Sequence, residues 1–179
     1  MKGIVFTNLN DLVEEAFGLE VWDKVLTNAK PASGGIYTSA DNYDDAELFN
    51  IVGEISKITG TKIEDLVFLF GEYLLSQFAK SYPAFFNNCS AKEFLKKVDE
   101  VVHVEVRKLY KDVGLPKFTY EDNAEDELVM LYESPRKLCH LAKGLISGTA
   151  KHYGIEIHNN ETKCLHSGDE LCRFELSFK

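Results

Sequence analysis

The amino-acid sequence predicts an α+β fold in which helices occupy the first part of the chain and strands the last part. Apolar residues recur at helical spacing in several early segments, most clearly from Asp44 to Thr59. From Pro116 onward the pattern changes to extended runs, interrupted by one helix from about Arg136 to Tyr153. No repeat, low-complexity stretch or linker divides the 179 residues, so we expect a single domain.

The helices are predicted from their apolar faces and from the residues at their ends. Two short amphipathic segments between Thr7 and Ala29 are separated by Gly18, and a third helix from Asp44 to Thr59 stops at Gly60. Capping boxes, in which a Ser or Thr is followed three residues later by Glu, predict two further helix starts. These boxes are Thr61-x-x-Glu64, opening a helix to about Lys80, and Ser90-x-x-Glu93, opening a helix to Tyr110.

Composition bounds the class of protein. An apolar fraction of 45% and a charged fraction of 27% are typical of a globular protein with a buried core. The net charge of −9 argues against nucleic acid or an anionic membrane as the main partner. The apolar runs are too short to span a bilayer, and Met1 to Phe6 lacks the features of a signal peptide. We therefore expect a cytoplasmic protein whose four cysteines are thiols or metal ligands.

One histidine and one short motif suggest specific chemistry. His103 lies at the edge of the apolar face of its predicted helix, near Asp99 and Tyr110. The motif Tyr132-x-Ser134-x-Arg136 follows the extended run Glu127 to Leu131, where alternate side chains share one side of the chain. Imidazole is a strong ligand for iron, and two hydroxyls with a guanidinium suit paired carboxylates. Haem needs both an axial ligand and partners for its two propionates.

Simpler interpretations of these features remain open at this point. A single helical histidine is usually structural or exposed. The motif can also be the start of the next helix, with Ser134 as N-cap and Pro135 at the first helical position. The acidic run from Glu121 to Glu127 is most simply the solvated tip of a hairpin.

In this order, the residues resemble the H-NOX family, the haem–nitric oxide/oxygen binding domains related to the sensor domain of soluble guanylate cyclase. The resemblance covers nearly the whole chain. It is carried by Met1-Lys2-Gly3, Asp99-Glu100-Val101-Val102-His103, Leu115-Pro116, Tyr132-Glu133-Ser134-Pro135-Arg136 and Gly144-Leu145-Ile146-x-Gly148. It implies a helical N-terminal part, about residues 1–60, over one face of a buried haem b. The remaining part, about residues 61–179, would contain an antiparallel sheet and the His103 helix. It would hold the other face of the haem.

The resemblance also implies roles for individual residues. His103 would be the axial ligand of the haem iron, and the propionates would bind Tyr132, Ser134 and Arg136. Pro116 matches a family proline that distorts the haem, although a loop proline before a strand is the simpler explanation from sequence alone. The aligned residues of the haem pocket are Leu9, Leu74, Phe78, Leu141 and Leu145.

The expected ligand follows from Leu141. H-NOX domains that hold oxygen carry at this position a tyrosine whose hydroxyl donates a hydrogen bond to it, and none of the aligned side chains here is a donor. The resemblance therefore implies a sensor that binds nitric oxide, and also carbon monoxide, while excluding oxygen. Its expected output is release of His103 and a change in a separate partner, since no catalytic domain follows in the chain. By family analogy this partner is a histidine kinase, as in two-component signalling, or a cyclic-di-GMP enzyme.

Two other classes of function compete with a sensor. A small-molecule-binding regulatory module of the vinyl-reductase type is similar at the C-terminal end but needs neither His103 nor the propionate motif, and a Soret band would separate the two. An enzyme is the more distant alternative, because the sequence contains no phosphate loop, H-E-x-x-H motif or nucleophile elbow.

Three cysteines, Cys139, Cys164 and Cys172, form a second candidate site. The turn signal Ser167-Gly168-Asp169 predicts that Cys164 and Cys172 face each other across a hairpin, and strand alternation puts Cys172 on the buried side. Three thiolates and a fourth ligand can hold tetrahedral zinc. Some H-NOX domains have such a structural zinc, with a histidine where this chain has Glu161. Glu161 can ligate through oxygen, a nearby histidine such as His158 or His166 can substitute, or the site can lack metal. Cys89 has no evident role.

Overall fold

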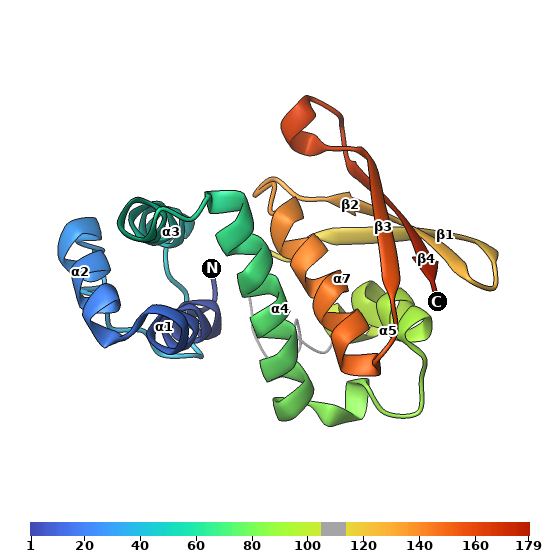
Figure 1. Ribbon diagram of the computed structural model, residues 1–179, viewed down its shortest axis with the longest axis horizontal. Coiled ribbons are helices and arrows are strands. Elements are labelled where there is room, and N and C mark those ends of the chain that lie inside the picture. The colour runs from blue at the N-terminus through green and yellow to red at the C-terminus, as the bar shows by residue number, and fades with distance from the viewer. Residues whose placement is uncertain (105–113) are drawn as a thin grey trace.

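The computed structural model describes residues 1–104 and 114–179, and these form an α+β fold with helices first and strands late, as predicted. The helices are α1 (Gly3–Phe17), α2 (Leu19–Ala29), α3 (Asp45–Thr59), α4 (Ile63–Ser81), α5 (Ala91–Lys97) and α7 (Cys139–Tyr153). The strands are β1 (Lys117–Ala124), β2 (Glu127–Glu133), β3 (Ile157–Lys163) and β4 (Cys172–Phe178). Figure 1 shows α1, α2 and α3 at one end and the sheet at the other, with α4 and α7 side by side between them.

Residue chemistry accounts for several helix ends. Gly18, with φ of 89°, separates α1 from α2 as predicted. Asp44 caps α3, since its carboxylate accepts a backbone N–H at 2.9 Å, and Gly60 ends that helix with φ of 74°. The capping box of Ser90 and Glu93 is present at the start of α5. In these places the local sequence is sufficient to determine where the helix begins or ends.

The predicted capping box at Thr61 and Glu64 is wrong. Helix α4 begins two residues later, at Ile63, and its N-cap residue Lys62 makes no side-chain cap. Thr61 is instead held by the end of the preceding helix, because its backbone N–H donates to the hydroxyl of Thr59 at 3.2 Å. A competing local hydrogen bond therefore overrides the capping signal.

The predicted start of α7 near Arg136 is also wrong. The helix begins at Cys139, and residues 134–137 form a turn closed by the Lys137 N–H donating to the carbonyl of Ser134 at 3.2 Å. Lys137 has φ of 49°, the left-handed conformation, which an α-helix does not allow. Ser134 is thus not an N-cap, and Pro135 is not the first helical residue. The motif belongs to a turn between β2 and α7.

The sheet is antiparallel throughout, with the strand order β1-β2-β4-β3, as the family resemblance implied. Strands β1 and β2 form the hairpin predicted around the acidic run, with the turn at Glu125 and Asp126. Alternate residues of β2 and β4 are buried against the helices. These buried residues are Leu128, Met130, Tyr132, Cys172, Phe174 and Leu176.

Buried apolar side chains form two clusters that meet at α4 and α7. The N-terminal cluster combines α1, α2 and α3 with Leu66, Phe70 and Leu74 of α4. The sheet cluster combines α5, α7 and the inner face of the sheet with Leu75 of α4. Phe78 and Leu145 pack against both clusters. Helices α4 and α7 are therefore the boundary between the two halves of the molecule.

Two glycines allow α4 and α7 to approach each other closely. A Cβ atom on Gly144 would lie 2.0 Å from the carbonyl oxygen of Phe68, and one on Gly71 would lie 2.5 Å from that of Leu141. Any larger residue at either position would push the helices apart. Gly144 belongs to the Gly144-Leu145-Ile146-x-Gly148 segment, so this part of the family resemblance has a direct packing reason.

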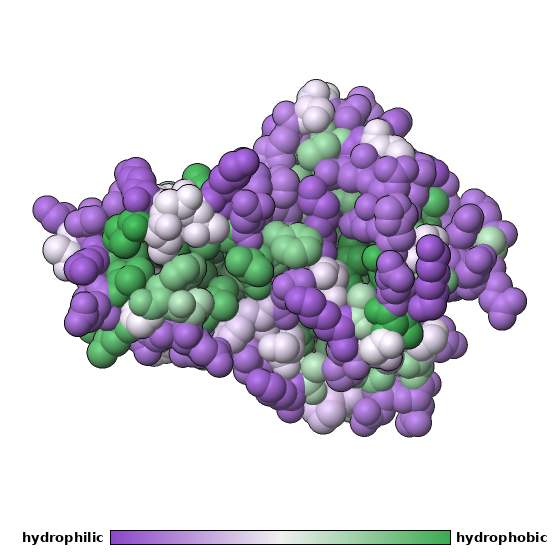
Figure 2. Space-filling view, viewed as in Figure 1, coloured by the Kyte–Doolittle hydropathy of each residue, from purple (hydrophilic) through white to green (hydrophobic). Residues whose placement is uncertain are grey.

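The surface differs between the two halves. Figure 2 shows apolar side chains gathered over the N-terminal helices and toward α4, while the sheet end is mostly hydrophilic on this face. Large apolar residues with substantial exposure include Leu19, Ile36, Phe49, Ile63 and Leu69. Within residues 1–104 and 114–179, no helix has the length and apolar character needed to cross a membrane.

Candidate functional site

His103 is buried on the segment that follows α5. A π-helical turn, Val98–Val102, separates it from that helix, and the imidazole side chain is 11% exposed. Its Nδ1 lies 3.2 Å from Oδ1 of Asp99. The predicted helix is thus present up to residue 104, while residues 105–113, including Tyr110, lie outside the described residues.

A row of rings connects His103 to the propionate motif. The centroids of His103 and Phe118 are 5.9 Å apart, and those of Phe118 and Tyr132 are 5.4 Å apart. Phe118 of β1 and Tyr132 of β2 are also paired in the sheet register. The fold therefore brings together the two features that are separate in sequence, the candidate iron ligand and the candidate propionate motif.

The hydroxyls of the motif organise the turn after β2. Tyr132 is buried, and its hydroxyl oxygen accepts the backbone N–H of Leu138 at 3.1 Å. Burial raises the pKa of Tyr132, so its hydroxyl stays protonated and can also donate. The Ser134 Oγ accepts the backbone N–H of Arg136 at 3.2 Å. These bonds fix the conformation from which the Arg136 side chain extends.

Arg136 binds a carboxylate, although not one that the sequence analysis identified. Its Nε donates to Oδ2 of Asp45, its Nη2 donates to Oδ1 at 3.2 Å, and its Nη1 donates to the carbonyl of Gly114. The N-terminal ammonium of Met1 also donates to Asp45, at 2.7 Å. Burial raises the pKa of Asp45, but these cationic partners outweigh it, so that the pKa is lowered overall. The geometry is that of a guanidinium fork suited to carboxylates.

Asp45 is the residue that sequence reasoning missed. The sequence suggests only a helix-start charge there, and 91 residues separate it from Arg136. No local pattern predicts this contact. Because Asp45 is the first residue of α3, the ion pair links the N-terminal helices to the turn after β2.

The predicted pocket residues belong to the two apolar clusters or pack against them. Leu9 and Leu74 are buried in the N-terminal cluster, and Leu141 packs against it. Phe78 and Leu145 contact both clusters and are only half-buried. Pro116 is half-buried directly before β1, as the loop-proline explanation also predicts.

These residues fit haem in chemical type. His103 is a buried imidazole with Nδ1 engaged by a carboxylate, which is the common arrangement of a metal-ligating histidine. Arg136 already holds a carboxylate in a forked contact. The half-buried side chains of Phe78 and Leu145 lie where the two clusters meet, and they are of the apolar type that contacts a large flat apolar group.

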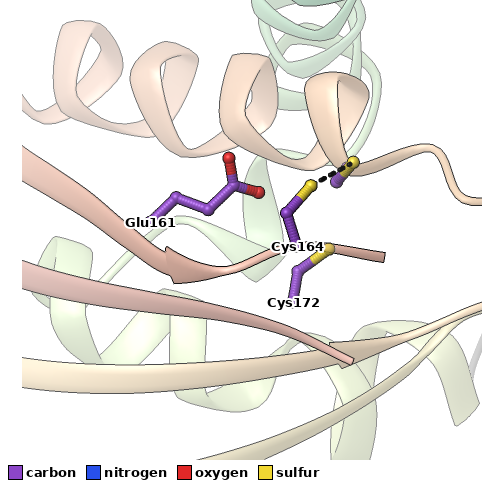
Figure 3. A group of neighbouring side chains, drawn as sticks. Glu161, Cys164 and Cys172 are labelled. Atoms are coloured by element: carbon purple, nitrogen blue, oxygen red, sulfur yellow. Dashed lines mark hydrogen bonds between the residues drawn. The ribbon is translucent and has the colours of Figure 1, made fainter. Parts of the chain in front are cut away.

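The three cysteines of the second candidate site come together as predicted. The sulfurs of Cys139 and Cys164 are 3.8 Å apart, and the ligand atoms of Cys139, Glu161, Cys164 and Cys172 all lie within 4.8 Å of one another. Figure 3 shows the carboxylate of Glu161 directed toward the Cys164 sulfur, with Cys172 below. Two sulfurs bound at about 2.3 Å to a tetrahedral zinc are about 3.8 Å apart, so the spacing suits that ion.

The two carboxylate oxygens of Glu161 have different surroundings. One oxygen, Oε2, accepts from the Lys143 ammonium at 2.9 Å. The other, Oε1, is buried and has no hydrogen-bond partner among the described residues. A buried carboxylate oxygen normally has a partner, and a metal ion in the cysteine cluster would supply one. Burial also raises the pKa of the Cys139 and Cys172 thiols and so disfavours their thiolate forms, which a bound cation would stabilise.

Two of the histidines near this cluster lie close to the Cys139 sulfur, and a third does not. His166 and His140 have ring nitrogens within 4.8 Å of each other and of the Cys139 sulfur, and a ring nitrogen of His166 lies 2.8 Å from the carbonyl of Lys137. His158 is exposed on β3 and belongs to neither group of close ligand atoms found among the described residues. His166 is thus the nearer substitute for Glu161. Cys89 contacts the Tyr153 hydroxyl at 3.3 Å, away from the cluster.

Comparison with known proteins shows which family the chain resembles. A family model described as Haem-NO-binding matches residues 2–161, which include His103 and the Tyr132–Arg136 motif. Soluble guanylate cyclase 89Db of Drosophila melanogaster is 22% identical over 179 residues, covering 96% of this chain and 26% of that protein. The chain therefore spans about a quarter of the length of the curated relatives that it matches.

Solved structures of similar length match over the whole chain. An H-NOX protein from Shewanella oneidensis in the Fe(II)NO state is 30% identical, with a TM-score of 0.93 and coverage of 100% of this chain and 99% of that one. An unliganded Fe(II) H-NOX protein from K. algicida is 34% identical, with a TM-score of 0.92 and coverage of 100% and 97%. Because the Haem-NO-binding model matches most of the chain and solved H-NOX proteins share its fold, this chain belongs to the H-NOX family of haem-based gas sensors.

Proposed function

We propose that this protein binds nitric oxide at ferrous haem b, excludes oxygen, and signals to a separate partner through release of His103. The observation that carries the proposal is the placement of His103, which is buried and has its Nδ1 on Asp99. A neutral imidazole with Nδ1 as donor has its Nε2 lone pair available for iron. The Haem-NO-binding match across this residue favours the sensor over a vinyl-reductase-type module.

Several residues of the chain would each make a different contact with the cofactor. His103 would hold the haem iron, and the haem, when bound, would supply a site for a diatomic gas whose binding could weaken the bond to this histidine. Arg136 would pair with a propionate through the fork that it now directs at Asp45, with Tyr132 and Ser134 contributing hydroxyl donors. Pro116, next to β1, would contact the haem and distort it.

Release of His103 is the step that would change the protein's surface. The ring contacts Asp99, whose carboxylate also accepts the backbone N–H of Phe118 in β1, so a freed imidazole would weaken this link between the π-helical turn and the sheet. A partner that fits only one of the two states would then bind or leave. We propose a histidine kinase or a cyclic-di-GMP enzyme as that partner.

Nitric oxide is favoured as the ligand by the character of the pocket. The S. oneidensis relative has been solved with nitric oxide and with carbon monoxide on its iron. In this chain, Leu9, Leu74, Phe78, Leu141 and Leu145 offer no hydrogen-bond donor. Bound oxygen carries partial negative charge and depends on a donor far more than nitric oxide does.

We expect the ferrous protein to form no lasting oxygen complex in air, while it takes up nitric oxide readily and carbon monoxide moderately. Absorption spectra of anaerobically reduced protein before and after exposure to each gas provide the measurement. A persistent oxygenated spectrum in the unmodified protein would overturn the assignment of oxygen exclusion.

A pair of variants at Leu141 isolates the role of the missing donor. Leu141→Tyr adds a hydroxyl and Leu141→Phe adds only the ring, so the difference between them reports one hydrogen bond. Such a bond to a polar ligand in a dry pocket contributes roughly 1–3 kcal/mol, and we expect measurable oxygen affinity only in the tyrosine variant. Equal oxygen affinity in both variants would contradict the donor argument.

We also propose a structural zinc ion held by Cys139, Cys164, Cys172 and Glu161. The sulfur spacing and the unsatisfied oxygen of Glu161 support it. Metal analysis of purified, untagged protein should give about one zinc per chain, because this is one four-ligand site. Cys164→Ser should lose the zinc together with thermal stability. Cys89→Ser, outside the cluster, is the matched control and should keep both. Metal-free protein that folds normally would contradict the site.

A further inference from the structure

Asp99 lies inside the π-helical turn that separates α5 from His103. The turn is closed by the backbone N–H of His103, which donates to the carbonyl of Val98. Turns of this width inserted in α-helices occur frequently at functional sites. Asp99 precedes His103 by four residues in the sequence. Its carboxylate is in contact with the His103 ring.

The carboxylate of Asp99 joins His103 to strand β1. Its Oδ1 lies 3.2 Å from Nδ1 of His103 and accepts the backbone N–H of Phe118 at 3.3 Å. The side chains of Asp99 and His103 are 25% and 11% exposed. An ordinary ion pair along a helix contacts only its own helix, whereas this oxygen is also held by a strand. Asp99 is therefore fixed from two directions, which allows it to orient the ring.

A carboxylate on Nδ1 has two effects on an imidazole that ligates a metal. It fixes the tautomer in which Nδ1 carries the proton and Nε2 faces the metal, and it makes Nε2 a stronger electron donor. Both effects strengthen the bond from Nε2 to iron. A stronger iron–histidine bond would be harder for nitric oxide to break.

We propose that Asp99 is a positioning residue that sets the strength of the iron–His103 bond and thereby the ease with which nitric oxide breaks it. This inference rests on the proposed function, because it requires His103 to be the iron ligand. It goes beyond that function by assigning the control of the response to a residue that touches neither iron nor gas. Asp99 would therefore tune the fraction of nitric oxide-bound protein in which His103 is released.

The test compares Asp99→Asn with Glu100→Gln in the haem-loaded protein. Asparagine retains an oxygen that can accept from Phe118 and removes only the negative charge beside His103. Glu100 is the exposed neighbour, so its variant removes the same charge without contacting the ring. We expect Asp99→Asn to shift the iron–histidine stretching band of the ferrous protein, measured by resonance Raman, to lower frequency. The same variant should raise the fraction with His103 released after nitric oxide binding, and Glu100→Gln should change neither value.

A measurement on the unmodified protein covers the case in which Asp99→Asn does not fold. In the carbon monoxide-bound ferrous protein labelled with ¹⁵N-histidine, the Nδ1 proton of His103 should exchange with water far more slowly than that of exposed His152. Exchange as fast as in His152, or an Asp99→Asn band at the unmodified frequency, would overturn the inference. A band that persists in His103→Gly would instead contradict the proposed function itself, so the two failures are distinguishable.

Discussion

His103→Gly should abolish the iron–histidine stretching band and strongly reduce haem retention unless imidazole is supplied. His103 is the candidate ligand, and it is buried beside the sheet with its Nδ1 in contact with Asp99. Losing a hydrogen-bonding partner of a metal ligand typically costs about 10- to 100-fold in metal affinity, so loss of the ligand itself should cost at least that much. Haem content and resonance Raman spectra of protein purified with and without imidazole provide the measurement.

His152→Gly is the matched control for this variant. It makes the same substitution at an exposed helical position in the last turn of α7. Glycine in a helix costs up to about 1 kcal/mol relative to alanine, and both variants carry such a cost. We expect His152→Gly to retain haem and its band. Full haem and an unchanged five-coordinate ferrous spectrum in His103→Gly would show that another residue ligates the iron.

Arg136→Ala should accelerate haem transfer to apomyoglobin by roughly 10- to 100-fold, since a hydrogen bond to a charged group contributes about 1.5–3 kcal/mol. The guanidinium fork is already directed at a carboxylate, and alanine leaves a propionate without that partner. Changing Tyr132 and Ser134 together should also accelerate haem transfer, because it removes two hydroxyl donors. The measurement is the transfer rate of the ferric haem.

Asp45→Asn separates propionate binding from a merely structural ion pair. If Arg136 serves only to hold α3, both Arg136→Ala and Asp45→Asn should accelerate haem loss, because each breaks the same contact. If Arg136 binds a propionate, Asp45→Asn should not accelerate it, since the guanidinium remains available. Arg173→Ala removes an arginine that pairs with Glu121 on the sheet, and it should leave the rate unchanged. An unchanged rate in Arg136→Ala would remove the propionate role.

The helix starts show where a local sequence pattern correctly predicts the first residue of a helix. The capping boxes at Ser90 and Thr61 are equivalent as patterns, yet only the one at Ser90 forms. Thr61 follows directly on the end of α3, where the Thr59 hydroxyl already accepts its N–H. Helix α7 begins only at Cys139, because Lys137 adopts a left-handed conformation that its residue type does not predict. A short pattern predicts well only where no neighbouring group competes for the same backbone atoms.

The sequence by itself determined the α+β class, the helices with clear apolar faces, the hairpin at the acidic run and the identity of the candidate ligands. Those properties depend on residue type and spacing, which are local. Only the tertiary structure decided that Asp45 pairs with Arg136, that the carboxylate of Asp99 links His103 to β1, and that Glu161 has one oxygen on Lys143 and one unsatisfied. Each of these features depends on how helices and strands pack against one another, which the residues adjacent in the chain do not determine.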